Sequence, residues 1–160
     1  MLPRAMSRDR DQRRVIATNR RARHLYNVLD ELECGLVLQG TEVKSLRAGR
    51  ASLQEAYARF EGGELFLFGA TIPEYAQGNI HNHEPTRPRK LLAHRRELSR
   101  WHRQVRQRGI TMVPLELYFL SHLVKLRLAL VKGKKVHDKR ERDRERTARR
   151  DIERALSRRR

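Results

Sequence analysis

Two apolar runs late in the chain constrain the fold more than any other feature. ITMVPLELYFL (110–120) and VKLRLALV (124–131) both alternate between apolar and polar positions, and only residues 121–123 separate them. Alternating runs joined by so short a link pair as antiparallel strands. Pro114 cannot donate to a ladder of backbone hydrogen bonds, so we expect it at an edge or at a bulge.

Two earlier stretches also have the pattern of strands. YARFEGGELFLFGATI (57–72) alternates on both sides of Gly62 and Gly63, which predicts a hairpin whose turn needs the positive φ that glycine tolerates. LYNVLDELECGLVLQG (25–40) predicts a long strand bent by a bulge at Gly35. The fold class is therefore mainly β with accessory helices, and five or six antiparallel strands close most economically into a small barrel.

Short helices and one long loop complete this arrangement. TEVKSLRAG (41–49) predicts a helix with Thr41 as its N-cap and Gly49 as its C-terminal stop. A second helix is expected at 95–108, where apolar residues recur at helical spacing. Residues 73–90 hold three prolines and no apolar run, which indicates a long surface loop.

The apolar content also sets the domain organisation. Residues 1–18 have no periodicity and many Arg and Asp, so we expect a disordered basic arm, with the first ordered element near His24. Residues 19–131 contain the apolar runs and should form one folded barrel, and residues 132–160 form a basic tail.

The net charge of +18 is spread unevenly along the chain. Residues 1–24 hold eight Arg against two Asp, residues 25–131 hold fifteen basic against eleven acidic residues, and residues 132–160 hold fourteen against six. A basic excess at both ends of a more balanced centre is typical of nucleic-acid binding, because each Lys or Arg laid on a phosphate releases condensed counterions.

An anionic membrane is the competing partner for so basic a chain. A helix that binds a membrane surface needs a broad apolar face, and the tail offers only Ala148, Ile152, Ala155 and Leu156. No apolar run is long enough to span a bilayer, and the first thirty residues lack the apolar region of a secretory signal. We therefore expect a cytoplasmic protein that binds nucleic acid rather than a membrane.

The tail has too little apolar surface to order by itself, although its residues are good helix formers. Asp138 with Arg142 and Glu145 with Arg149 lie four residues apart with the acid first, which favours a helix. We expect the tail to fluctuate alone and to become helical on a partner rich in phosphates. A tail that only solvates the protein is the alternative, but the lysine cluster KGKK (132–135) is better suited to phosphate contact.

Several motifs in one order carry a resemblance to a known family. ARHLY (22–26), GTEVKSLRAG (40–49), PTRPRKLL (85–92) and KGKK with DKR (132–140) together resemble small protein B, the tmRNA-binding (SsrA-binding) family of bacterial trans-translation. The similarity covers roughly residues 19–150. It implies an OB-fold-like antiparallel six-stranded β-barrel with accessory helices, plus a basic C-terminal tail that becomes helical on its partner.

The resemblance also implies a function without catalysis or cofactors. Members of the family bind the tRNA-like domain of tmRNA and deliver alanyl-tmRNA to ribosomes stalled on non-stop mRNA. The partners implied are tmRNA, the ribosome (chiefly its small subunit) and elongation factor Tu, with a monomer when the protein is free. The tail would lie as a helix along the empty mRNA channel and so sense the stall.

Two sets of residues are implied by the matching positions. The tmRNA-binding set comprises Glu33, Glu42, Lys44, Arg47, Arg87, Arg89, Lys90, Leu92 and Lys125. The set that faces the ribosomal decoding centre and the mRNA channel comprises His24, Lys132, Lys134, Lys135, Asp138, Lys139 and Arg140. Basic groups would meet phosphates, acids would accept from base edges or 2′-hydroxyls, and Leu92 would pack on an unstacked base.

Some of these side chains allow other interpretations. His81 and His83 form an HxH pattern with His94 further on, but no Cys or acid cluster completes four metal ligands. We therefore expect no metal, and place these histidines in solvent or against RNA. Trp101 could stack on a base, but its helical spacing favours the core, and Cys34 among apolar residues should also be a core side chain.

Two rival functions remain open at this point. A catalytic pair made of Glu33 and Glu42, or an RNA-processing enzyme that uses His24 with a carboxylate, would require the groups to lie close together. A general RNA-chaperone barrel without specificity for stalled ribosomes would not need the tail beyond Asp138. An adaptor of ribosome rescue is the interpretation that the motifs favour.

Overall fold

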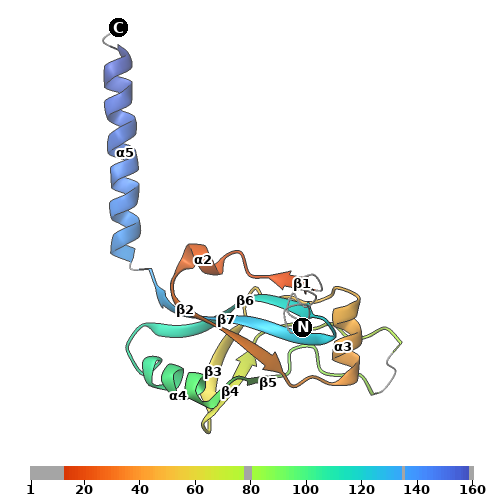
Figure 1. The fold of residues 1–160 in the computed structure, drawn as a ribbon. Helices are drawn as coiled ribbons and strands as arrows, with labels where there is room; N and C mark the ends of the chain where they lie inside the picture. The colour runs from red at the N-terminus through yellow and green to blue at the C-terminus, as the bar shows by residue number, and fades with distance from the viewer. Residues whose placement is uncertain (1–12, 78–80, 135, 159–160) are drawn as a thin grey trace, which may run out of the picture.

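The computed structural model describes residues 13–77, 81–134 and 136–158, with the backbone alone for 136–143 (Figure 1). In chain order the elements are β1 (Arg13–Thr18), α2 (Ala22–Leu25), β2 (Tyr26–Leu36), α3 (Gly40–Arg47), β3 (Tyr57–Glu61), β4 (Glu64–Phe68), β5 (Arg89–Leu92), α4 (Arg95–Gln104), β6 (Ile110–Leu120), β7 (Leu123–Gly133) and α5 (Val136–Arg158). The fold is mainly β with a few helices, as the sequence predicts.

The sheet contains seven strands in the part of the chain that the structure describes, where six were expected. Their order is β1-β6-β3-β4-β5-β2-β7, and β6 also pairs with β7. All pairings are antiparallel, and those among the last six strands form a closed cycle. The β3–β6 link in this cycle is the single residue pair Ala58 and Met112. The seventh strand, β1, pairs with the C-terminal half of β6.

The prediction of a disordered arm over residues 1–18 was wrong for its last six residues. β1 pairs with β6 from Arg13 opposite Leu120 to Thr18 opposite Glu116. Backbone hydrogen bonds to β6 and the packing of Ile16 against the core stabilise a segment whose own composition predicts no order. Residues 1–12 lie outside the described part of the chain.

Both predicted hairpins are confirmed. β6 and β7 pair along their whole length, and the register shifts between Pro114 and Glu116, so the proline lies at a bulge as expected. β3 and β4 pair across a turn in which Gly62 and Gly63 have φ of 58° and 80°. A third glycine, Gly69, has a φ of 76°, and a Cβ there would lie 2.5 Å from the carbonyl oxygen of Glu55.

Three other local predictions need correction. The bulge in β2 lies between Val28 and Asp30 and not at Gly35. The N-cap of α3 is Gln39 and not Thr41, because Gln39 and Glu42 exchange side-chain and backbone hydrogen bonds in a capping box. The predicted loop over residues 73–90 ends two residues early, since β5 already begins at Arg89.

Apolar side chains from β2 to β7 fill the interior of the closed sheet, and Ile16 and Ala17 of β1 pack against them. Trp101 of α4 is fully buried in this core, as predicted, and its Nε1–H donates to Oδ2 of Asp30 at 3.0 Å. Cys34 is buried as well, and desolvation raises the pKa of its thiol to about 12. A thiol with that pKa remains protonated near neutral pH, in keeping with a core side chain.

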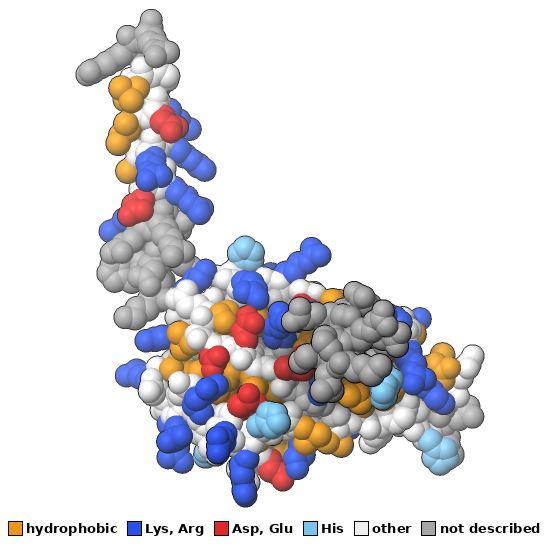
Figure 2. Space-filling view, viewed as in Figure 1, with side chains coloured by type: hydrophobic (Ala, Val, Ile, Leu, Met, Phe, Trp, Pro, Cys, Tyr) orange, Lys and Arg blue, Asp and Glu red, His pale blue; other side chains and the backbone are white. Residues whose placement is uncertain are grey.

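α5 extends away from the sheet and begins where β7 ends (Figure 1). Its side chains from Arg144 to Arg158 are exposed, and hydrophobic ones gather on one side of it, with Lys and Arg on another (Figure 2). The helix confirms the helix-forming character of the tail, while its dependence on a partner stays a prediction. Among the described residues, no helix is both long and apolar enough to cross a membrane.

Candidate nucleic-acid interface

Three of the predicted RNA contacts meet on the outer face of the sheet. β2 pairs on both sides at Gly35, which lies opposite Leu92 of β5 and Lys125 of β7. Glu33 lies two residues earlier and projects from the same face, whereas Cys34 between them points into the core. Leu92 is 48% exposed, and Glu33 is also exposed. We call Glu33, Leu92 and Lys125 the Gly35 surface.

Glu33 is held in place by a residue that the sequence reasoning did not single out. Tyr118 of β6 lies opposite Lys125, and its hydroxyl donates to Oε2 of Glu33. Burial, and then the Glu33 carboxylate, raise the pKa of Tyr118, so its hydroxyl remains a donor. Alternation along β6 places Tyr118 on the outer face, but only the register between β6, β7 and β2 brings it to Glu33.

Lys90 extends the Gly35 surface along β5. It lies two residues before Leu92 and so on the same face, opposite Phe66 of β4. Its Nζ is 3.0 Å from Oε1 of Glu64, and both side chains are partly exposed. Lys90 is therefore at the surface, but a neighbouring carboxylate already balances its charge.

Two further predicted contacts, Glu42 and Arg89, differ from expectation because both side chains are fully buried. Nε of Arg89 donates to Oε2 of Glu42 at 2.5 Å, and Nε of Arg87 donates to Oε1 at 2.9 Å. The Arg89 guanidinium also donates to the carbonyl oxygens of Ala70 and Pro85. We call Glu42, Arg87 and Arg89 the Glu42 network, and only Arg87 of the three is partly exposed.

The network fixes the protonation state of its carboxylate. Burial alone would raise the pKa of Glu42, but hydrogen bonds from the Gln39 N–H, Arg89 and Arg87 outweigh it and lower the pKa below 4.5. Burial also lowers the pKa of Arg89, and the Glu42 carboxylate opposes that change. The network therefore joins α3 to the first residue of β5 and to the segment before it by internal ion pairs.

His83 is also buried, contrary to the expectation that it meets solvent or RNA. Its Nε2 is 2.8 Å from the carbonyl oxygen of Ile72, and its Nδ1 is 2.9 Å from Oγ1 of Thr41. These contacts tie the loop to α3 beside the Glu42 network. His81 is exposed, and the described residues contain no group of three or more His, Cys, Asp or Glu that could hold a metal ion.

Lys44 and Arg47 are exposed on α3. Nζ of Lys44 lies 5.6 Å from the centre of the Tyr75 ring, within the range of a cation–π contact. The carbonyl oxygen of Arg47, at the C-terminal end of the helix, accepts from Nη2 of Arg14 at 2.8 Å. The ammonium group of Lys44 and the guanidinium group of Arg47 remain available to a partner, whereas Glu42 of the same helix is buried.

Three of the residues expected to face the ribosome, His24, Lys132 and Lys134, lie at the opposite end of β2 and β7. Asn27 pairs with Lys132, and the N–H of Lys134 donates to the carbonyl oxygen of Leu25 at 3.3 Å. His24 lies next to Leu25 on α2 and is exposed. The start of the tail is thus beside α2. Lys135 and the side chains of Asp138, Lys139 and Arg140 lie outside the described part of the structure.

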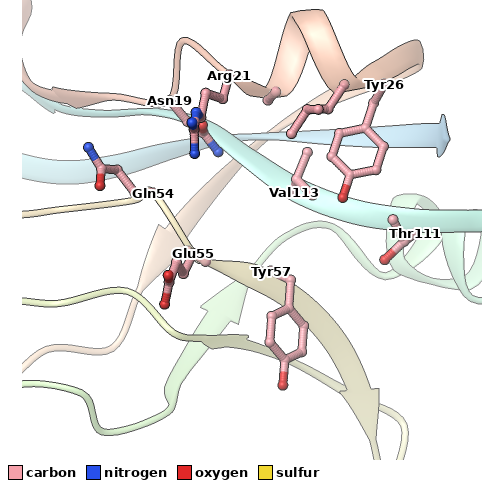
Figure 3. A pocket seen from close by; sticks show the side chains of 11 residues that line it. Asn19, Arg21, Tyr26, Gln54, Glu55, Tyr57, Thr111 and Val113 are labelled. Atoms are coloured by element: carbon pink, nitrogen blue, oxygen red, sulfur yellow. The ribbon is translucent and has the colours of Figure 1, made fainter. Parts of the chain in front are cut away.

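A cavity of about 360 Å³ lies beneath α2 (Figure 3). Its walls come from the segment before α2, the segment before β3 and the start of β6, and include Tyr26, Tyr57 and Asn19. Arg21 and Glu55 both line it, so the cavity has no single sign of charge. It therefore shows no preference for an anion or a cation.

A small antiparallel sheet with exposed cationic side chains, continued by a basic helix, is characteristic of nucleic-acid-binding proteins. The family model described as "SmpB protein" matches residues 16–158. The chain therefore belongs to the SmpB protein family.

Relatives from several bacteria agree with this assignment. The SsrA-binding protein of Carboxydothermus hydrogenoformans is 52% identical over 143 residues, which cover 89% of this chain and 96% of the relative. That of Acidothermus cellulolyticus is 54% identical over 147 residues, with 92% of each chain covered. A chain in a solved structure described as "tmRNA-SmpB: a journey to the center of the bacterial ribosome" is 48% identical, with a TM-score of 0.62, and the match covers 74% of this chain and 84% of that one.

Proposed function

We propose that this protein is a non-enzymatic RNA-binding adaptor of trans-translation in the bacterial cytoplasm. It binds the tRNA-like domain of tmRNA as a monomer and, with elongation factor Tu, delivers alanyl-tmRNA to ribosomes stalled on non-stop mRNA. Support comes from relatives called SsrA-binding proteins and from the solved structure that names tmRNA, SmpB and the ribosome together. The closed cycle of six strands supports an OB-fold-like barrel as its folded domain.

The observation that carries this proposal is the Gly35 surface. It combines an ammonium group, a carboxylate oriented by Tyr118 and an exposed leucine within one small area of sheet. Lys125 can meet a phosphate, Glu33 can accept from a base edge or a 2′-hydroxyl, and Leu92 can pack on an unstacked base. Lys44 and Arg47 on α3, Arg87 bound to Glu42 of that helix, and Lys90 on β5 add cationic contacts to the same RNA.

Glu42 and Arg89 serve RNA binding indirectly in this proposal. Their buried ion pair joins α3 to the start of β5, and so supports the helix on which Lys44 and Arg47 are exposed and the Glu42 carboxylate that Arg87 contacts. A rigid support of this kind lowers the entropy lost when exposed side chains bind a ligand. Direct contact of either group with RNA would require it to leave its buried partners.

The ribosomal contacts lie at the other end of the molecule. His24 on α2, together with Lys132 and Lys134 at the base of the tail, can meet the decoding centre. Lys135, Asp138, Lys139 and Arg140 continue into α5, which senses the empty mRNA channel because messenger RNA in the channel would occupy the same space. Ordering of the helix against ribosomal phosphates would then couple binding to stall detection.

The first experiment is a filter-binding titration of tmRNA against an unrelated RNA of equal length at moderate salt. We expect the full chain to prefer tmRNA by a large margin. Equal affinities would contradict the proposal and favour a general RNA chaperone. Incubation of labelled RNA with the purified protein should give no cleavage, and turnover would instead indicate an RNA-processing enzyme.

A second experiment separates the two ends of the molecule. Deletion of residues 138–160 should leave tmRNA affinity nearly unchanged but abolish peptide tagging in a reconstituted translation system. As a matched control, replacement of the same residues by an uncharged Gly-Ser segment of equal length should also fail to support tagging. Loss of tmRNA binding on deletion would contradict the division between sheet and tail.

A further inference from the structure

A second cavity lies where β1, the end of α3 and the turn between β6 and β7 meet. It has a volume of about 380 Å³ and is lined by Arg14, Arg47, Phe119, Ser121 and His122. Neither Arg14, Phe119 nor His122 is among the positions that the resemblance implicates in RNA binding. We call this cavity the arginine pocket.

Strand alternation places Arg14 in the arginine pocket. Neighbouring residues on β1 project from opposite faces, and Arg13 on the outer face pairs with Glu116 and lies 4.3 Å from the centre of the Tyr118 ring. Arg14 projects the other way, where its Nη2 donates to the carbonyl oxygen of Arg47 at 2.8 Å. Its guanidinium carbon is 5.9 Å from the centre of the Phe119 ring, which helps to hold it in place.

The pocket concentrates positive charge without a balancing acid. None of its described lining residues is acidic, and neither Arg14 nor Arg47 forms an ion pair with a described residue. The cavity beneath α2 differs in this respect, because an acidic residue, Glu55, lines it together with Arg21. Arg14 and Arg47 both bring a positive charge to this pocket, and like charges repel each other unless an anion lies between them.

The chemistry of the lining selects a particular kind of anion. Guanidinium groups present rigid pairs of N–H donors that match the oxygens of a phosphate, and Arg14 uses only one contact on Arg47. The His122 imidazole can donate a further N–H, and Phe119 adds an apolar residue to the lining. An oxyanion with several acceptor oxygens would satisfy more of these donors than a halide would.

We propose that the arginine pocket binds a backbone phosphodiester of the RNA that the Gly35 surface contacts. This inference rests on the proposed function and adds Arg14 and His122 to the residues that bind RNA. Arg47 belongs to both sites, so the RNA backbone would run from α3 past the end of β6. The pocket fixes the position of the RNA and reads no base, because phosphate contacts carry no sequence information.

The test compares the salt dependence of tmRNA binding between variants of the full chain. Arg14→Gln should weaken binding about three- to tenfold near physiological salt and reduce the slope of log K against log salt by about 0.7 to 0.9, the loss of one phosphate contact. His122→Gln should weaken binding less and add to the effect of Arg14→Gln. Arg59→Gln is the matched control, since it removes the same charge from a strand arginine that already pairs with Glu61.

Equal changes of slope in Arg14→Gln and Arg59→Gln would overturn the proposal, because they would reflect net charge alone. An unchanged slope in Arg14→Gln would also overturn it. Arg14→Lys keeps the charge but loses the paired donors, so it should keep the slope and still lose affinity. This variant replaces Arg14→Gln in the test if the glutamine variant melts below the assay temperature. If the wild-type chain binds tmRNA and unrelated RNA equally, the proposed function fails while this slope comparison remains valid.

Nuclear magnetic resonance distinguishes a phosphodiester of RNA from a free anion. Addition of tmRNA should shift the Nε–H signal of Arg14 and the imidazole signals of His122, and inorganic phosphate should do so only at much higher concentration. Shifts with inorganic phosphate but none with RNA would indicate a site for a free anion and would contradict the assignment. No shift with either would contradict it as well.

Discussion

The Gly35 surface and the Glu42 network both lie close to the end of β2 and each contains a glutamate, but Glu33 of the first is exposed and Glu42 of the second is fully buried. Glu33 accepts a single hydrogen bond from Tyr118 and stays exposed. Glu42 accepts from Gln39, Arg87 and Arg89 and has no exposed surface. The same residue type therefore supplies a ligand contact in one place and structural support in the other, according to the number of internal donors around it.

The largest expected effect separates the two regions by stability. Glu42→Gln leaves the buried Arg89 guanidinium without its counter-charge, so we expect the free energy of unfolding to fall by about 3 to 5 kcal/mol. Urea denaturation measures this change. Glu64→Gln, which removes the exposed partner of Lys90, should cost less than about 1 kcal/mol. A Glu42→Gln variant with unchanged stability and weakened RNA binding would show that Glu42 contacts RNA and does not support the fold.

The free energy of unfolding should depend on acid pH through Glu42, the buried glutamate. The pKa of Glu42 is lowered in the folded state from its ordinary value of 4.5, so its ionised form stabilises the fold above that pH. This contribution is lost as the pH falls through the lower folded-state pKa. The difference in unfolding free energy between wild type and Glu42→Gln should therefore shrink between pH 5 and the acid end of a titration. A constant difference would place the cause outside the ionisation of Glu42.

A smaller effect is expected at the Gly35 surface, and on binding instead of stability. Lys125→Gln should weaken tmRNA binding by about 1 to 3 kcal/mol, the worth of a charged hydrogen bond, and change the free energy of unfolding by less than about 0.5 kcal/mol. Filter binding and urea denaturation of one preparation give both values. Arg59→Gln, which removes the same charge from a β3 residue that already pairs with Glu61, is the matched control. Equal losses of affinity in the two variants would show that Lys125 has no special position.

The smallest effect tests whether Tyr118 supports the Gly35 surface. Tyr118→Phe removes the hydroxyl that orients Glu33 and keeps the ring, so tmRNA binding should weaken by about 1 kcal/mol or less. The loss should disappear in a Glu33→Gln background, since the hydroxyl then has no carboxylate to orient. Additive losses in the double variant would show that Tyr118 acts independently of Glu33.

Features set by nearby residues could be predicted from the sequence. The β6–β7 hairpin, the glycine turn after β3 and the burial of Trp101 all follow from patterns within about ten residues. β1 could not be predicted in this way, because its order depends on pairing with β6, a hundred residues away in the sequence. Its own apolar run, Val15 to Ala17, is too short to indicate a strand without that partner.

The burial of the Glu42 network was missed for a similar reason, although a local signal existed. Glu42 and Arg89 are 47 positions apart, so no local pattern connects them. Within RKLL, however, Arg89 and Leu91 share one face and Lys90 and Leu92 the other. Once the segment is recognised as a strand, the burial of Leu91 implies that of Arg89, and the exposure of Leu92 implies that of Lys90.

The length of α5 has a consequence for any assembly that contacts both the sheet and the tail. Its 23 residues span about 35 Å at 1.5 Å per residue, so the far end lies well beyond the reach of a side chain on the sheet. The helix thereby sets a fixed spacing between two contact points. Inserting seven residues would lengthen the helix by about 10 Å and nearly restore the direction of each face. Inserting five residues would turn the basic side roughly to the opposite direction. Distance and orientation could thus be varied separately in the same helix.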